Sequence, residues 1–460
     1  MKFENKWSFS PYRPALYDVG EPYICRVAPG KNEIAFEWLG EADAEYDVFL
    51  RKLGDERYVS DKTNGTSYVF RGLMSDTDYE FYVSRGNGRS RVRLARTCEI
   101  DGTVVNYLHP NDTAYSFSGQ YLCSPCVIRH PDGFLLASMD VFGAGTPQNL
   151  SLIFRSDDNG KTWHYVSELF PCFWGRMFIH RGELYMMACS TEYGDLLIGK
   201  STDGGKTFSM PTVLLRGSCH SKVAGVHKNP QPPVIYGGRI YMTLEWGSWG
   251  EKFYHAAMVA SADENADLCD SASWSFSEPV LYDPEWKGVA QGRSCGNIEG
   301  TLCVFPDGKL YNVMRYDMTK CTPSYGLVLA YKVNTKDPEA PLEYSHPIKL
   351  PGNHSKFTIR YDDVSGYYYT IICRITGVGH ECDRNLVSLM RSRNAEKWET
   401  VCDLIDETDK DPKKIGFQYI DFLFDGDDLI WLCRTSYGEP HNFHDANYSV
   451  FHRTEKFRNL

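Results

Sequence analysis

The chain has 460 residues, a formal net charge of −11 and a sequence pI near 5.7. This acidic balance argues against nucleic acid and anionic membranes as main partners, and no stretch approaches the roughly 18 apolar residues of a membrane span. Aromatic residues make up 14% of the chain, and 39 glycines and 23 prolines supply many turns. Because aromatic side chains favour strands, the composition predicts an all-β protein.

The cysteine content indicates a reducing compartment. The chain contains 15 cysteines, an odd number, and several lie inside apolar runs, as Cys189 does in MMACS and Cys433 in WLCR. Buried free thiols are typical of proteins kept under reducing conditions. The first residues, MKFENKWSFSPYRP, contain no apolar secretory segment. We therefore expect a cytoplasmic protein without a membrane partner, and this composition is compatible with oligomerisation.

Residues 1–104 are predicted to form an N-terminal segment and a small β-sandwich. Apolar and polar residues alternate in three short segments, at 34–38, 46–50 and 79–83. Such alternation is typical of strands that bury one face. The region resembles a fibronectin type III module in the spacing Leu73…Thr77-x-Tyr79-x-Phe81-x-Val83, with Trp38 upstream. The resemblance implies a spacer or an interaction surface, and we assign the region no chemistry.

Residues 105–460 contain a repeat in which a turn glycine precedes a short apolar strand. Six copies recur at intervals of roughly 50–70 residues. They are Gly133-FLLASM, Gly182-ELYMMAC, Gly238-RIYMTLEW, Gly308-KLYNVM, Gly366-YYYTIIC and Gly426-DDLIWLC. The interval suits a four-stranded blade with loops of variable length. The repeat therefore predicts a six-bladed β-propeller over residues 105–460, with a large irregular β-sandwich as the alternative.

Two copies are followed by the motif S-x-D-x-G-x-T-[WF], at 156–163 and 201–208, and 392–398 is a third copy without the Asp and Gly. The Asp and Ser side chains can bond turn amides, and the Gly supplies a corner with positive φ. We interpret these motifs as Asp boxes, which are structural turns. On these residues the chain resembles the sialidase-like, Asp-box propeller superfamily over residues 105–460.

The last residue of each apolar strand in the repeat is polar. These residues are Asp140, Ser190, Glu245, Arg315, Arg374 and Arg434. Equivalent positions of propeller blades meet around one axis, so we expect them at one end of the central channel. Guanidinium groups bind carboxylates in a bidentate manner, so three arginines predict an anionic ligand. The alternative is that each arginine pairs with a neighbouring acid and ties blades together.

Further candidates for substrate binding follow the repeat strands. Glu192 and Trp246 come directly after their strands, at the same end as the arginines, and His227 lies in a loop. Trp246 can stack on a sugar ring, or it can pack at the rim. Residues 441–445 combine imidazole and carboxylate groups but match no common metal spacing, so we expect neither a metal nor a cofactor.

The resemblance to sialidases implies a set of roles. In sialidases an arginine triad holds the sugar carboxylate, a tyrosine activated by a glutamate is the nucleophile, and an aspartate is the acid/base. The resemblance assigns the glutamate to Glu299, the second and third arginines to Arg315 and Arg384, and the tyrosine to Tyr419. The sequence that matches the first arginine is Cys123-Ser124-Pro125, which has none.

Two roles therefore have no direct counterpart. Arg374 and Arg434 are candidates to replace the first arginine, and Asp140 is the nearest candidate for the acid/base. A route through paired carboxylates also stays open, with the acid and base drawn from Glu299, Glu245, Glu192 and Asp140.

Together these observations predict an exo-acting glycoside hydrolase that releases a terminal sugar from small glycans, with an acidic sugar favoured. Two alternatives remain. One is a lyase acting on uronic acids, in which arginines neutralise the carboxylate and a Tyr or His removes the α-proton. The other is a propeller that binds glycans without catalysis.

Overall fold

The computed structural model describes residues 6–9, 22–250, 255–293 and 296–460. Within these residues the regular structure is almost entirely strand, and the helices are two short 3-10 turns, η1 (Ser271–Ser273) and η2 (Phe457–Asn459). The prediction of an all-β protein is therefore confirmed. No helix in the described part is long and apolar enough to cross a membrane, and the fourteen cysteines described there form no disulfide.

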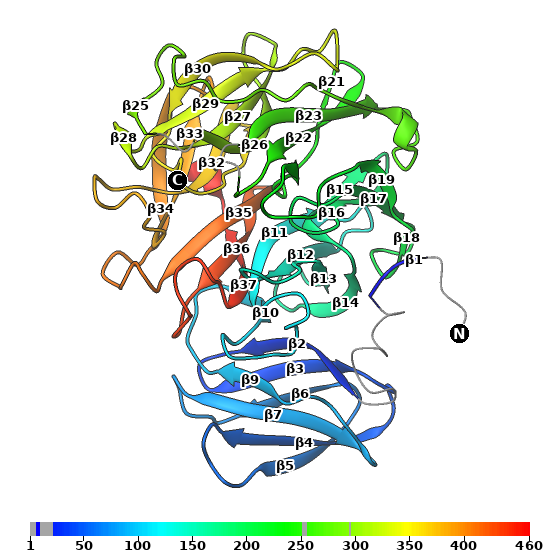
Figure 1. The fold of residues 1–460 in the computed structure, drawn as a ribbon. Coiled ribbons are helices and arrows are strands. Elements are labelled where there is room, and N and C mark those ends of the chain that lie inside the picture. Colours follow the sequence, from blue (N-terminus) through cyan, green and yellow to red (C-terminus); the bar gives the residue numbers. More distant parts are fainter. Residues whose placement is uncertain (1–5, 10–21, 251–254, 294–295) are drawn as a thin grey trace.

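A small β-sandwich lies beneath the larger body of the molecule (Figure 1). One sheet has the order β2-β3-β6, with β2 (Tyr23–Pro29), β3 (Glu33–Leu39) and β6 (Ser67–Arg71). The other has the order β5-β4-β7-β8 with β9 beside β7, and comprises β4 (Glu45–Lys52), β5 (Val59–Asn64), β7 (Asp78–Arg85), β8 (Gly88–Arg89) and β9 (Arg93–Arg96). Buried residues alternate with partly exposed ones in β3, β4 and β7, which contain the three predicted segments.

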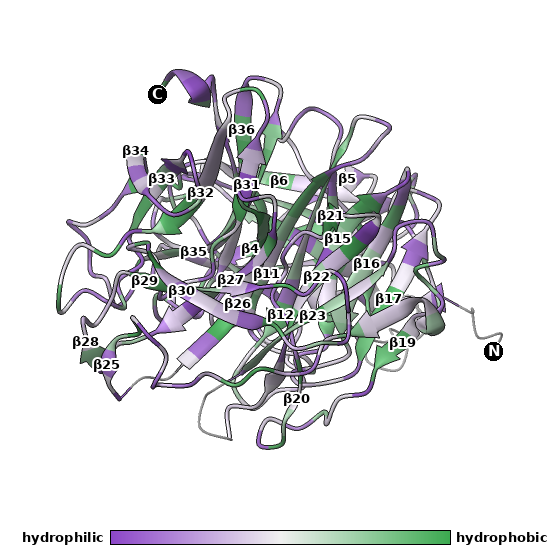
Figure 2. Cartoon of the chain, turned by 90° about the horizontal axis from the view of Figure 1, so that it is seen from above, coloured by the Kyte–Doolittle hydropathy of each residue, from purple (hydrophilic) through white to green (hydrophobic). Residues whose placement is uncertain are grey.

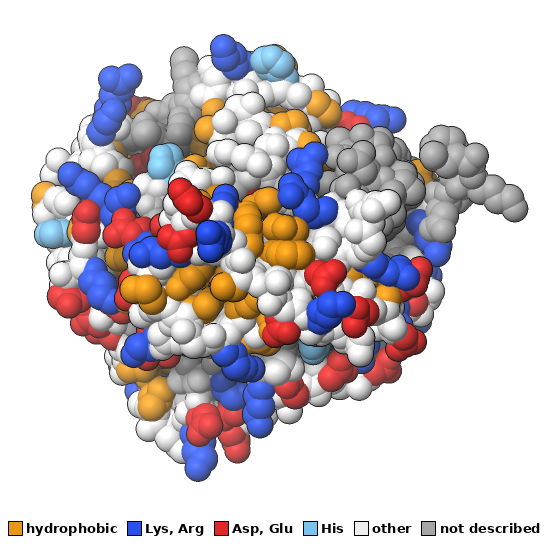
Figure 3. All heavy atoms as spheres, turned by 90° about the horizontal axis from the view of Figure 1, so that it is seen from below, with side chains coloured by type: hydrophobic (Ala, Val, Ile, Leu, Met, Phe, Trp, Pro, Cys, Tyr) orange, Lys and Arg blue, Asp and Glu red, His pale blue; other side chains and the backbone are white. Residues whose placement is uncertain are grey.

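Figure 3 views the molecule from the side of the sandwich. Basic and acidic side chains are interspersed around hydrophobic ones on this face, and no continuous basic surface is visible there. Such a mixture of charges is typical of an ordinary solvated surface.

Six antiparallel sheets make up the larger body within the described residues. The first three contain β11 (Tyr121–Arg129), β12 (Leu135–Phe142), β13 (Leu150–Ser156) and β14 (His164–Leu169); β15 (Phe173–His180), β16 (Glu183–Cys189), β17 (Leu196–Ser201) and β19 (Thr212–Leu215); and β20 (Gly225–His227), β21 (Val234–Tyr236), β22 (Arg239–Gly247), β23 (Ala256–Asp263) and β24 (Trp274–Phe276). The last three contain β26 (Gly296–Val304), β27 (Leu310–Asp317), β29 (Leu327–Lys332) and β30 (Glu343–Lys349); β31 (Ile359–Asp362), β32 (Tyr367–Cys373), β33 (Leu386–Ser392) and β34 (Trp398–Asp406); and β35 (Gly416–Asp425), β36 (Asp428–Ser436), β37 (Tyr448–Thr454) and β10 (Thr103–Tyr107).

Two short ribbons complete the strand list in the described part. β1 (Lys6–Trp7) pairs with β18 (Phe208–Ser209), and β25 (Gln291–Gly292) pairs with β28 (Cys321–Thr322).

The six sheets follow one another around a common centre (Figure 1). We call β11, β15, β20 with β21, β26, β31 and β35 the first strands, because each precedes the turn with the repeat glycine in its sheet. β11 contacts β15 and β35, and β26 contacts β22 and β31. The sixth sheet is completed by β10, which comes from the start of this region and pairs with β37. This pairing ties both ends of the region into one sheet.

Hydrophobic residues concentrate on the strands in the middle of the molecule, whereas the loops at its edge are mostly hydrophilic or neutral (Figure 2). The fully buried apolar residues form clusters between successive sheets, such as those around Met187, Leu152 and Leu329. The sheets are therefore held together mainly by apolar packing between their faces.

The glycine repeat marks the turn before the second strand of each sheet. All six repeat glycines have positive φ, from 64° at Gly426 to 94° at Gly133. The strands that follow them are β12, β16, β22, β27, β32 and β36. Glycine adopts this conformation without steric cost, so it recurs wherever the first strand turns into the second.

The two motifs at 156–163 and 201–208 fold into turns with the same hydrogen bonds. In the first, Asp158 accepts bonds from Ser156 Oγ at 2.8 Å and from the Thr162 amide at 2.9 Å, and Gly160 N donates to Ser156 Oγ at 2.8 Å. The second repeats this set with Ser201, Asp203, Gly205 and Thr207. These aspartates bond their own turns.

The segment from Ser392 to Trp398 keeps part of this arrangement without the aspartate. Asn394 Oδ1 accepts from Ser392 Oγ at 3.1 Å and from Lys397 N at 2.9 Å. Ala395 takes the corner, with φ of 59°.

Candidate functional site

Four of the first strands contain a β-bulge at a similar depth. The pairing with the second strand shifts between Cys123 and Cys126, Phe173 and Arg176, Ile298 and Gly300, and Gln418 and Asp421. Each bulge holds one non-glycine residue at positive φ: Ser124 at 51°, Trp174 at 52°, Glu299 at 55° and Tyr419 at 58°. Such a conformation costs about 1–3 kcal/mol per residue and is concentrated at functional sites.

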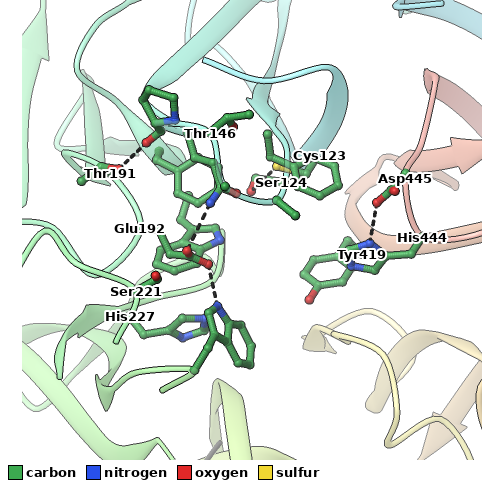
Figure 4. Close-up of a pocket in the computed structure, with 18 of the residues that line it drawn as sticks. Cys123, Ser124, Thr146, Thr191, Glu192, Ser221, His227, Tyr419, His444 and Asp445 are labelled. Carbon is green, nitrogen blue, oxygen red and sulfur yellow. Dashed lines mark hydrogen bonds and ion pairs between the residues drawn. The ribbon is translucent and has the colours of Figure 1, made fainter. Parts of the chain in front are cut away.

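All four of these bulge residues line one cavity of about 690 Å³, which we call the Tyr419 cavity. A cavity of this size is in the range that holds a small-molecule ligand. Glu192, His227, Trp249, Arg434 and His444 also line it. Figure 4 shows Glu192 and His227 on one side of the open space and Tyr419 with His444 on the other.

Tyr419 and Glu299 are joined directly within the wall of this cavity. The Tyr419 hydroxyl donates to Glu299 Oε1 at 2.5 Å, and Arg315 Nη1 donates to Glu299 Oε2 at 2.6 Å. The same Nη1 atom lies 3.4 Å from the Tyr419 hydroxyl. Glu299 is 4% exposed, so its negative charge is stabilised by these partners rather than by water.

The electrostatics place the shared proton on the tyrosine. Burial, followed by the charge of Glu299, raises the pKa of Tyr419 above its ordinary value. Burial alone would raise the pKa of Glu299, but the charge of Arg315 and the hydrogen bonds to Glu299 lower it below its usual value. Glu299 is therefore an ionised acceptor in contact with a protonated phenol, as a base must be before it removes a proton.

Arg434 stands over the ring of Tyr419. Its Cζ lies 5.1 Å from the Tyr419 ring centroid and 4.5 Å from that of Phe142. Nη2 donates to the His444 carbonyl at 2.5 Å, and Nε has no hydrogen-bond partner among the described residues. Arg434 is therefore a cation in the wall of the cavity.

Arg384 is held next to the same group. Nη1 donates to the side-chain oxygen of Gln418, and Nη2 donates to the His354 carbonyl at 3.1 Å. Its positive charge acts on the Tyr419 phenol together with those of Arg315 and Arg434. Three arginines therefore surround Tyr419.

The structure does not bring Arg374 into this group, contrary to the expectation from the repeat. Arg374 Nη2 bonds both carboxylate oxygens of Asp403, at 2.9 and 2.8 Å, and Nε bonds Ser388 Oγ at 2.8 Å. Both partners belong to its own sheet, where Asp403 on β34 draws the side chain away from the centre. Arg374 therefore pairs with a neighbouring acid, which was the alternative to binding an anionic ligand.

Asp140 and Glu245 lie behind the cavity wall, and each bonds the backbone of a neighbouring bulge. Asp140 Oδ2 accepts from Gly175 N at 3.2 Å, and Glu245 Oε1 accepts from Gly300 N at 3.1 Å. These amides follow Trp174 and Glu299 directly in the chain. Both carboxylates are 1% exposed and neither lines the cavity. Asp140 and Glu245 are therefore placed to hold the bulges of Trp174 and Glu299 in position, and not to contact a ligand in the cavity.

Of the remaining residues predicted to bind substrate, two line the Tyr419 cavity and one does not. His227 lines the cavity and pairs through Nδ1 with Glu245. Glu192 also lines it, accepting from Trp249 Nε1 at 2.5 Å and from Gln148 Nε2 at 3.2 Å, and burial raises its pKa. Trp246 instead packs against the apolar cluster between the second and third sheets.

Sequence reasoning missed several residues of the cavity wall. Ser124 and Trp174 enter it through bulges, which are shifts of strand register and leave no local signature. His444 and Asp445 line it from the loop before β37, where Asp445 accepts from His444 Nδ1 at 3.0 Å. Burial and the charge of Arg434 lower the pKa of His444 to about 4, so it is neutral near pH 7.

No group of three or more His, Cys, Asp or Glu side chains in the described ranges is arranged to hold a metal ion. The histidines and aspartate of residues 441–445 instead bond one another, with His441 Nδ1 3.0 Å from Asp445 Oδ2.

Asp140 gives the stability of the protein a pH dependence. Burial raises its pKa from 3.8 to about 7, so ionisation between these values destabilises the folded state. The favourable contribution is complete below pH 3.8 and is lost as the pH rises through 7. Asp140→Asn should remove a change of about 4 kcal/mol between pH 4 and pH 8, because three pKa units correspond to about that energy.

Asparagine suits the site of Asp140. Its oxygen can accept from Gly175 N and its amide can donate to Ser151, whose hydroxyl lies 3.3 Å from the Cys172 carbonyl. Urea unfolding of both proteins at pH 4 and pH 8 measures the difference. Equal losses of stability with pH in wild type and Asp140→Asn would contradict the assignment.

Comparison with known proteins supplies the fold but no family: no protein-family model matches the chain, and no curated protein matches it. Among solved structures, an α-L-arabinanase from Penicillium chrysogenum complexed with arabinobiose is 14% identical with a TM-score of 0.51, covering 78% of this chain and 99% of that one. A Hadza microbial sialidase is 11% identical with a TM-score of 0.50, covering 95% and 94%.

An α-L-arabinofuranosidase from Fusarium graminearum, in complex with an iminosugar inhibitor, is 14% identical with a TM-score of 0.50, covering 77% of this chain and 98% of that one. At these identities the likeness concerns the fold. The chain therefore has the sialidase-like propeller fold that these glycoside hydrolases share.

Proposed function

We propose that the protein is an exo-acting, retaining glycoside hydrolase that releases a terminal acidic sugar. The observation that carries the proposal is the 2.5 Å hydrogen bond from Tyr419 to Glu299 in the cavity wall. Both residues sit in bulges at positive φ, so the backbone is bent in two separate sheets to bring them together.

In the first step Tyr419 acts as the nucleophile. A phenol is weakly nucleophilic near neutral pH unless a base takes its proton, and Glu299 accepts that bond. The Tyr419 oxygen forms a bond to the anomeric carbon while its proton passes to Glu299. The bond to the departing oxygen breaks, and that oxygen takes a proton from Glu192, which faces Tyr419 across the cavity (Figure 4).

In the second step water replaces the tyrosine. Glu192, now ionised, removes a proton from a water molecule, whose oxygen bonds to the anomeric carbon from the side of the departed group. The bond from that carbon to Tyr419 breaks, and Tyr419 regains its proton from Glu299. Two inversions at one carbon retain its configuration.

Three arginines favour a substrate that carries a carboxylate. Arg434 lines the cavity, and the charges of Arg315 and Arg384 act on Tyr419 beside it. Because arginine is always charged and offers paired donors, this group suits a sugar carboxylate more than a neutral ring. In this proposal Arg434 takes the place of the first arginine, for which the sequence has Cys123.

We also propose assignments for the architecture. The six sheets are interpreted as the blades of a six-bladed propeller, closed by the pairing of β10 with β37. The two bonded turns and the third at Asn394 are interpreted as Asp boxes. The strand orders β2-β3-β6 and β5-β4-β7-β9 support a fibronectin type III module. A cytoplasmic location remains a prediction.

A panel of glycosides tests the proposed activity. Aryl glycosides of sialic acid, glucuronic acid and arabinofuranose are supplied, and NMR spectroscopy follows the first anomer released. We expect turnover of an acidic glycoside with retained configuration. Release of arabinose alone, an inverted product or an unsaturated uronate that absorbs in the ultraviolet would each contradict the proposal.

The proposed acid predicts a dependence on the leaving group. Glu192→Gln should lower kcat by about 10²–10⁴-fold for unactivated disaccharides, which need a proton on the departing oxygen, and much less for 4-nitrophenyl glycosides. Because burial raises the pKa of Glu192, the protonated acid persists to higher pH, and wild-type kcat should fall as the pH rises through that value. An unchanged alkaline limb in Glu192→Gln would assign the acid to another group.

A further inference from the structure

The centre of the molecule contains more buried positive than negative side chains. Lys228, Lys356 and Arg176 are at most 2% exposed, and the Arg360 side chain is 21% exposed. Asp421, which is 0% exposed, is the carboxylate that Arg176, Lys356 and Arg360 face, whereas Lys228 interacts with Asp140. Buried charges need partners, so the hydrogen bonds of this group decide whether it is complete.

The two lysines are bonded by backbone carbonyls. Lys228 Nζ donates to the Trp174 carbonyl at 2.7 Å, and Lys356 Nζ donates to the Ile420 carbonyl at 3.2 Å. Burial lowers the pKa of both to about 8, so either can lose its charge at modest cost. Neither lysine therefore requires a further anion.

The two arginines cannot lose their charge and are bonded incompletely. Arg176 Nη1 donates to Asp421 Oδ2 at 2.5 Å and to the Pro230 carbonyl at 3.2 Å, but Nε has no partner among the described residues. Arg360 Nη2 lies 3.6 Å from Asp421 Oδ1, and neither Nε nor Nη2 makes a hydrogen bond within the described ranges. One carboxylate thus serves two guanidinium groups, and donors remain.

Both arginines line a cavity of about 790 Å³, which we call the Arg360 cavity. The Arg360 cavity and the Tyr419 cavity lie at different points along the same first strands. β26 lines the Tyr419 cavity at Glu299 and the Arg360 cavity at 302–304. β35 lines the Tyr419 cavity at Tyr419 and the Arg360 cavity at 423–424. The two cavities share no lining residue. Aromatic side chains form much of the wall of the Arg360 cavity, namely Phe178, Phe305, Tyr361, Tyr368 and Phe424.

We propose that the Arg360 cavity is a second binding site, for a small molecule that carries a carboxylate or phosphate on an apolar ring. The oxyanion pairs with Arg360, whose side chain is 21% exposed in the cavity, and lies beside the buried Arg176, as planar guanidinium groups favour. The ring packs against the aromatic wall. The anion adds negative charge beside Arg176 and Arg360, which otherwise share the single carboxylate of Asp421. This binding site is separate from the proposed catalytic site.

Thermal unfolding with defined probes tests the site. Benzoate, phenyl phosphate and inorganic phosphate are titrated, with benzyl alcohol as the neutral control. We expect benzoate or phenyl phosphate to raise Tm, inorganic phosphate to do so at higher concentration, and benzyl alcohol to have no effect. The stronger of the two ring anions identifies the headgroup. No stabilisation by any of the three anions would overturn the proposal.

Two variants separate this cavity from the other. Arg360→Leu should weaken anion binding by about tenfold or more, whereas Arg434→Gln in the Tyr419 cavity should leave it unchanged. Because two nitrogens of Arg360 make no bond in the described structure, Arg360→Leu should fold, and Arg360→Gln is the reserve variant. An undiminished Tm shift in either Arg360 variant, or its loss in Arg434→Gln, would refute the site.

Discussion

Tyr419→Phe is expected to lower kcat by about 10³-fold or more on the substrate identified, with Tm close to that of wild type. The variant removes one hydroxyl, and with it the proposed nucleophile. Glu299 keeps its bond from Arg315 at 2.6 Å, so no buried charge is left without a partner. Steady-state kinetics and thermal unfolding measure the two effects separately.

Glu299→Gln tests the proposed base in the same way as Tyr419→Phe tests the nucleophile. An amide cannot take the phenolic proton, so kcat should fall by about 10²–10⁴-fold even though the side chain keeps its shape. Tyr68→Phe is the matched control, because its hydroxyl bonds Asp61 in the sandwich, far in sequence from the cavity. Activity within tenfold of wild type in Tyr419→Phe and Glu299→Gln would remove the dyad from the mechanism.

Asp421→Asn is expected to cost about 3–5 kcal/mol of folding free energy, the largest loss we foresee for one substitution. Asp421 Oδ2 accepts from Val127 N of β11 at 2.9 Å and from Arg176 of β15 at 2.5 Å, so one carboxylate joins three first strands. Removing its charge leaves Arg176 and Arg360 without their common anion.

The pH dependence of this contribution has a definite sign. Burial alone would raise the pKa of Asp421, but Arg176, Lys356 and Arg360 lower it below its ordinary value. The stabilisation is therefore present above the pKa of the unfolded chain and is lost as the pH falls through the folded value. Asp421→Asn should lack this acid-dependent loss.

Urea unfolding measures both effects, with Asp425→Asn as the matched control on the same strand. Asp425 bonds Arg129 Nε at 2.9 Å but its side chain is 19% exposed, so water can replace much of that interaction. A loss below about 1 kcal/mol in Asp421→Asn would show that the central cations do not depend on this carboxylate.

The fold was predictable from the sequence where a backbone conformation strongly favours one residue type. Gly133 and Gly426 occupy turns with positive φ, so a glycine followed by an apolar strand recurs in every sheet and marks the second strand. Likewise, alternation in residues 34–38 predicts a strand because one face of β3 packs against the opposite sheet of the sandwich.

The site was predictable only in part, because strand position does not fix side-chain direction. Arg315 and Arg374 end equivalent strands, yet Arg315 turns to Glu299 and Arg374 to Asp403. The difference depends on which acid lies within reach, which is a property of the packed sheets. The bulges that expose Ser124 and Trp174 are equally tertiary, since they exist only as a shift against the neighbouring strand.

The buried cations illustrate a further limit of sequence patterns. Lys356 lies in the sequence Asn353-His354-Ser355-Lys356, which looks like an ordinary polar loop. It is 1% exposed, and its Nζ donates to the Ile420 carbonyl on β35. No periodicity in the sequence indicates that this lysine is buried.

Trapping the glycosyl-enzyme tests the role of Tyr419 most directly. A fluorinated glycosyl fluoride of the substrate sugar slows hydrolysis of the intermediate, and peptide mass spectrometry then locates the sugar. We predict one added sugar on the peptide that contains Tyr419 and none in Tyr419→Phe. A sugar attached to the peptide of Glu299 or Glu192 would contradict the tyrosine mechanism and assign the nucleophile to a carboxylate.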